Sequence, residues 1–156
     1  MTPNNEAGGA AEEADALAAG DSIAILDGLA AQLDVEGKEL QAVRYRERAL
    51  ILRSERFGLM APEVSDACEQ LVLAANTVAM RQLRDGEHAV ALELLSKAEM
   101  LTERKGCLAG RPSRVKLRAV TFNNFGCFYK LRAKMHTALQ HATLPLHTTA
   151  VATHPT

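Results

Sequence analysis

Apolar residues recur every three or four positions along most of the chain, which is the spacing of one face of an α-helix. The first clear run comprises Ile23, Leu26, Leu29, Ala30 and Leu33. The pattern predicts five long helices and a short one. The first helix begins at Asp21 or Ser22 and ends at Gly37, the second runs from Lys38 to about Arg56, and the third from Pro62 to Asp85–Gly86. The fourth follows that turn and ends near Gly106, the fifth begins at Pro112 or Ser113, and the short one runs from Lys134 to Thr143.

Glycine and proline divide these helices. Gly37, Gly58 and Gly86 stand where helices end, and Pro62 suits a first helical turn. Upstream, residues 1–20 are rich in Ala, Gly and Glu and are expected to be a disordered acidic leader, or one that adds a frayed helical turn over Ala11 to Ala19. The helical domain is expected to cover 21–146, with a disordered tail over 147–156.

Three segments align without gaps around a tight turn at Gly37, Gly86 and Ala133. Each has a small residue in its first helix and Ala in its second. Small residues let helix backbones approach closely, so each pair is expected to mark a crossing of antiparallel helices. The predicted crossings are Ala30 with Ala42, Ala79 with Ala91, and Gly126 with Ala138.

The third segment resembles the tetratricopeptide repeat (TPR) family through Phe122, Phe125, Gly126, Tyr129 and Ala138. The 47 to 49 residues that separate Ala42, Ala91 and Ala138 exceed the usual repeat of about 34. They are similar to the longer repeats of kinesin light chain. The resemblance implies an all-α, α-α superhelix of about three helix pairs. Pro145 truncates the last pair, because proline within a helix costs about 3 kcal/mol.

The resemblance also implies a concave groove that binds a peptide or helix. Asn76, Asn123 and Asn124 would contact the ligand backbone, and Lys130 an acidic ligand. The plainer interpretation is that these are ordinary polar residues of helices. The leading hypothesis is a non-catalytic adaptor or scaffold. An alternative is a structural subunit of a cytoskeletal or ciliary assembly, which docks or self-associates through its uncapped C-terminal end.

Charge narrows the range of partners. The net charge is −1, so bulk attraction to nucleic acid or to an acidic membrane is not expected. Before Glu39 nearly all charges are acidic, and from Arg104 to Lys134 all are basic. These runs suit solvated helix faces, or a basic patch for an acidic partner or for the chain's own acidic end. Nucleic-acid binding through 104–134 is a minor alternative.

Chemistry-bearing residues do not form a recognisable site. Cys68, Cys107 and Cys127 are an odd number without CxxC spacing, so free thiols in a reducing compartment are expected, with Cys127 a buried structural thiol. His136 and His141 are five residues apart, which points them to different helix faces. The chain is therefore expected to be neither an enzyme nor a cofactor- or metal-binding protein. No signal peptide or membrane-spanning run is visible, so a cytoplasmic protein is expected.

Overall fold

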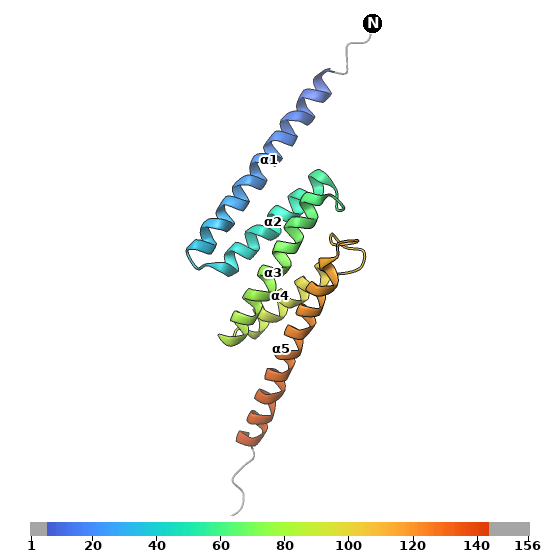
Figure 1. Cartoon of the computed structure of the whole chain (residues 1–156). Coiled ribbons are helices and arrows are strands. Elements are labelled where there is room, and N and C mark those ends of the chain that lie inside the picture. The colour runs from blue at the N-terminus through green and yellow to red at the C-terminus, as the bar shows by residue number, and fades with distance from the viewer. Residues whose placement is uncertain (1–5, 144–156) are drawn as a thin grey trace, which may run out of the picture.

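The computed structural model describes residues 6–143 and contains only helices in that range (Figure 1). The prediction of an all-α fold is confirmed. The elements are α1 (Glu6–Val35), α2 (Glu39–Phe57), α3 (Pro62–Arg84), α4 (His88–Leu101) and α5 (Ser113–Thr143).

The first four helices form two antiparallel hairpins, α1–α2 and α3–α4, that stack through α2 and α3. Both hairpin turns pass through a glycine with positive φ, at Gly37 (73°) and Gly86 (85°). Glycine accepts this left-handed conformation without a Cβ clash, so these two positions end a helix where most residues would continue it. Pro62 occupies the first turn of α3, as the sequence predicts.

The two helices of each hairpin carry buried alanines. Ala30 and Ala42 are 2% and 0% exposed, and Ala79 and Ala91 are both fully buried. Around them, larger side chains fill the core between α3 and α4, and full burial of each stabilises the fold by roughly 1.5–3 kcal/mol. The largest of these are Leu71, Leu94 and Leu95.

The third predicted hairpin is wrong. The turn expected at Ala133 does not exist, because α5 continues without a break to Thr143. Gly126 and Ala138 therefore lie on one helix, about 18 Å apart at a rise of 1.5 Å per residue, and both are exposed. Tyr129, expected to pack in the repeat, is 59% exposed. The physical reason is local, since Ala133 is a good helix former where the other turns have glycine.

The start of the first helix also differs from the prediction. Ser22 does not cap a helix: its hydroxyl donates to the carbonyl oxygen of Ala18, one turn back in α1, at 2.9 Å. In the structure residues 6–20 belong to α1, because alanine and glutamate propagate a helix once it is nucleated. Residues 1–5 and the predicted tail at 147–156, together with Pro145, lie outside the described residues.

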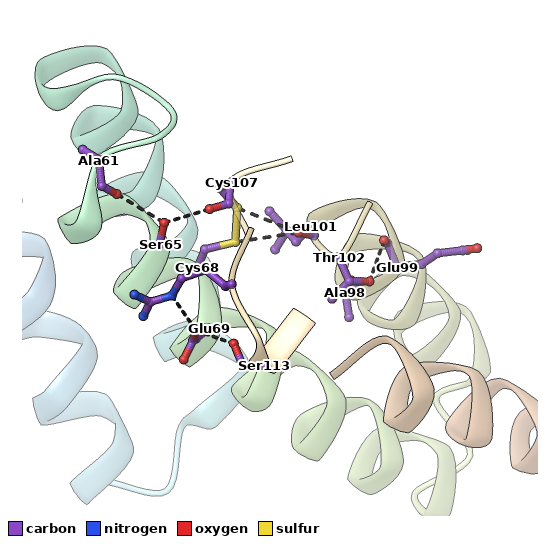
Figure 2. Close-up of a disulfide and its surroundings, with 11 residues drawn as sticks. Ala61, Ser65, Cys68, Glu69, Ala98, Glu99, Leu101, Thr102, Cys107 and Ser113 are labelled. Atoms are coloured by element: carbon purple, nitrogen blue, oxygen red, sulfur yellow. Dashed lines mark hydrogen bonds and ion pairs between the residues drawn. A yellow bond between two sulfur atoms is a disulfide. The ribbon is translucent and has the colours of Figure 1, made fainter. Parts of the chain in front are cut away.

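Two cysteines that were expected to be free form a disulfide between α3 and the loop that follows α4 (Figure 2). The Cα atoms of Cys68 and Cys107 are 6.6 Å apart. Beside the disulfide, the Ser65 hydroxyl donates to the Cys107 carbonyl oxygen at 2.9 Å. The prediction failed because nothing in local spacing pairs cysteines 39 residues apart. The prediction for Cys127 is also wrong, because its free thiol is exposed rather than buried.

The loop between α4 and α5 is further held by Glu69 of α3. The Glu69 carboxylate accepts hydrogen bonds from the Ser113 hydroxyl and from Arg111 Nε, the latter at 3.0 Å (Figure 2). The Ser113 hydroxyl first, and then Arg111, lower the pKa of Glu69. These bonds place the start of α5 against α3, so that α5 then packs across both α3 and α4.

Candidate protein-interaction surface

The four residues predicted to line a groove are not brought together. Asn76 is buried, with only 4% of its surface exposed. Its Nδ2 donates to Thr121 Oγ1 of α5 and to the Val72 carbonyl oxygen, both at 2.9 Å, and its Oδ1 accepts from Asn124 Nδ2 at 2.8 Å. Its amide is thus engaged within the fold, and assigning Asn76 to a ligand groove is wrong. It joins α3 to α5.

The remaining predicted residues divide between two faces of α5. Asn124 is half-buried and faces α3 through its bond to Asn76. Asn123 and Lys130 are exposed and are seven residues apart, so they share a face that is turned away from α3. Exposure leaves these two side chains accessible to a partner, which keeps their predicted role open.

A line of exposed residues runs along α5 beside the face of Asn123 and Lys130. We call it the α5 seam; it comprises Val115, Ala119, Phe122, Gly126, Tyr129 and Ala133, all of them exposed. The spacings alternate between four and three residues, which is the spacing of the core positions of a coiled coil. A face with this period is suited to a second helix lying along α5.

The seam alternates large and small residues. Val115, Phe122 and Tyr129 are 65%, 48% and 59% exposed, and each is followed four residues later by Ala or Gly. A Cβ atom added at Gly126 would meet nothing within 4 Å, so the backbone there is open to close approach. Ridges separated by hollows are what a packed helix interdigitates with.

Buried rings support the aromatic residues of the seam from beneath. Phe125, which is buried against the core, stacks on Tyr129 with 6.1 Å between ring centroids and contacts Phe122 at 6.4 Å. Phe128 meets the Tyr129 ring edge-on at 5.2 Å. Side chains that are already held in place lose little freedom when a partner binds, so the seam is partly preorganised.

Cations border the seam on both sides, and α5 contains no acidic residue. In coiled-coil geometry the flanking positions are the residues that choose the partner. Those flanks hold Lys116, Asn123 and Lys130 on one side and Arg118, Phe125 and Arg132 on the other. The seam is therefore matched to a helix with acidic flanks.

Further cations from the loop before α5 adjoin the start of the seam. A hollow of ≈ 670 Å³ there is lined by Arg104, Lys105, Arg114 and Phe122 among others, and by one acidic residue, Glu103. Arg118 lies over the Phe122 ring, with 4.9 Å from the guanidinium carbon to the ring centroid, and donates to the Glu99 carbonyl oxygen at 3.1 Å. Here a cationic and an apolar surface adjoin, which suits an acidic, amphipathic partner.

A second groove lies between α1 and α3, over α2. Two adjoining hollows of ≈ 370 and ≈ 480 Å³ share Arg46 and Gln70 in their linings. Arg46 pairs with Asp34, and Arg53 of the same groove pairs with Asp27. Both arginines are thus engaged in holding α1 to α2, and this groove presents no exposed apolar stripe comparable to the α5 seam.

No metal-binding cluster is present in the part of the chain that the structure describes. No group of three or more His, Cys, Asp or Glu gathers there to hold a metal. His136 contacts Gln140 of the same exposed helix at 2.9 Å, and the Cys127 thiol lies on the outer face of α5. Among residues 6–143, every helix is too short or too polar to cross a membrane.

Comparison with protein-family models, with curated proteins and with solved structures finds no match for this chain. The sequence contained a signal for the seam, because the alternating spacing from Val115 to Ala133 is visible in it. The same spacing also fits packing within the predicted third hairpin. Because α5 is continuous, these residues are exposed to solvent instead.

Proposed function

We propose that this chain is a non-catalytic protein-interaction module that binds an amphipathic helix along the α5 seam. The observation that carries the proposal is the alternation of large and small exposed residues at coiled-coil spacing, from Val115 to Ala133. Such a stripe leaves apolar surface in water, and a docked helix would remove it. The two hairpins and α5 serve as the rigid support.

A TPR-like superhelix remains part of the proposal. It is supported by two stacked hairpins with glycine turns and buried alanines, and by the place of α5 beside the second hairpin as the first helix of a further pair. On that view the partner supplies the helix that would complete the pair. A link to kinesin light chain or to the cytoskeleton rests on the sequence resemblance alone.

The experiment uses a synthetic helical peptide with Ala and Leu at its core positions and Glu at its flanks. We expect it to bind the full chain, measured by fluorescence anisotropy. In the variant Gly126→Gln a side chain occupies the open backbone position, and binding should weaken at least about tenfold. Glutamine is a better helix former than glycine, so the thermal stability of this variant should equal or exceed that of the wild type.

The matched control is Ala138→Gln, which places the same side chain at an exposed position of α5 outside the seam. We expect this variant to bind the peptide as the wild type does. Equal affinity of Gly126→Gln and Ala138→Gln, or no binding by the wild type, would contradict the proposed function.

A further inference from the structure

The two terminal helices carry opposite and unmixed charge. α1 has seven acidic residues and no basic one: Glu6, Glu12, Glu13, Asp15, Asp21, Asp27 and Asp34. In contrast, α5 has six basic residues and no acidic one: Arg114, Lys116, Arg118, Lys130, Arg132 and Lys134. The central helices α2, α3 and α4 each carry both signs. This segregation calls for an explanation, because ordinary solvated faces mix their charges.

The complementary helices do not meet within one molecule. Among the described helices α1 contacts only α2, and α5 contacts only α3 and α4. The first half of α1 extends beyond the hairpin at one end of the molecule, and the second half of α5 extends beyond it at the other (Figure 1). All side chains from Arg132 to Ala142 are exposed. A contact between α1 and α5 is therefore available only between two copies of the chain.

The sequence of the extending half of α1 has the spacing that the α5 seam requires. Ala7, Ala10, Ala14 and Leu17 follow one another at intervals of three, four and three residues. Small residues in one helix complement the large ones of the seam, Phe122 and Tyr129. Acidic residues adjoin the core positions, as Glu6 does Ala7 and Glu13 does Ala14, where they would meet the cations beside the seam.

We propose that the occupant of the α5 seam is the acidic first half of α1 from a second copy of this chain. This inference rests on the proposed function, since it names the partner of the same surface. The contact joins two different surfaces, so it either repeats head to tail or is made twice within a symmetric pair. It would bury part of the apolar stripe of one copy and bring acidic side chains to cations of α5 at the same time.

The test is sedimentation velocity of the full chain over a range of concentrations. We expect association that grows with concentration at low salt and weakens at about 1 M salt, where the screening length falls to about 3 Å. The double variant Glu6→Lys with Glu13→Lys should weaken association at least about tenfold, and so should Gly126→Gln. The control is Glu55→Lys with Glu87→Lys, which makes the same charge change at exposed sites outside α1 and should associate as the wild type does.

The outcomes separate this inference from the proposed function. A full chain that stays monomeric at all concentrations but still binds the acidic synthetic peptide would overturn self-docking and leave the function standing. Equal association of the α1 charge variant and its control would also overturn it. A chain that neither associates nor binds the peptide would remove both.

Discussion

Replacing Asn76 by alanine tests whether this residue joins α3 to α5. The substitution removes two inter-helix hydrogen bonds, with Thr121 Oγ1 (2.9 Å) and Asn124 Nδ2 (2.8 Å). Each is worth about 1 kcal/mol net, and the half-buried Asn124 amide loses up to about 1 kcal/mol more without its acceptor, whereas the Thr121 hydroxyl keeps its bond to the Leu117 carbonyl oxygen. Alanine recovers about 0.6 kcal/mol as the better helix former. We therefore expect Asn76→Ala to lower the free energy of unfolding by about 2 kcal/mol.

The assay is urea denaturation followed by far-ultraviolet circular dichroism. Asn123→Ala is the matched control, because Asn123 is an exposed asparagine of α5 next to Asn124, and it should change stability by less than about 0.5 kcal/mol. A double-mutant cycle with Thr121→Val should show a coupling of about 1 kcal/mol, since each single change already breaks their shared bond. Strict additivity in that cycle, or an Asn76→Ala variant as stable as the control, would refute the reasoning.

Two further predictions follow from the contacts around the α4–α5 loop. Reducing the Cys68–Cys107 disulfide should lower the free energy of unfolding by about 4 kcal/mol on the chain-entropy model for a span of 39 residues, measured by urea denaturation with and without reductant. Cys127→Ser is the control and should lose stability on reduction as the wild type does. A wild-type protein whose stability does not change with reductant would contradict the prediction. Because Ser113 and Arg111 lower the pKa of Glu69, its contribution to stability is present above the unfolded pKa of about 4.3 and is lost as the pH falls through the folded value. In the variant Glu69→Gln the free energy of unfolding should therefore fall less steeply between about pH 5 and pH 3 than in the wild type. An equal slope in both proteins would argue against a stabilising role of the Glu69 carboxylate.

Sequence reasoning succeeded for the hairpins because their signals are local. A glycine at a hairpin turn determines where a helix ends, as at Gly37 and Gly86, and each acts through its own backbone conformation. The apolar period then selects the face that is buried, which places Ala30, Ala42, Ala79 and Ala91 in the core. None of these inferences needs information from a distant part of the chain.

The errors arose where one pattern permits two tertiary arrangements. The stripe of Phe122, Gly126 and Tyr129 satisfies the pattern of a buried hairpin and equally that of an exposed docking face. Without a glycine at position 133, the choice depends on whether the helix continues, and in this structure it does. Likewise, the sequence predicts one groove role for Asn76 and Asn123, although Asn76 bonds to a neighbouring helix and Asn123 is exposed.

By itself, the sequence of this protein determined that the chain is helical, that its first two helix pairs turn at glycines, and that acidic and basic residues are separated between its two ends. Only the tertiary structure decided that Cys68 meets Cys107, that Asn76 is enclosed by α5, and that the α5 seam is uncovered. The physical reason is the distance along the sequence between the residues that interact. Helix formation depends on neighbours within a few residues, whereas burial and pairing depend on which helices pack together.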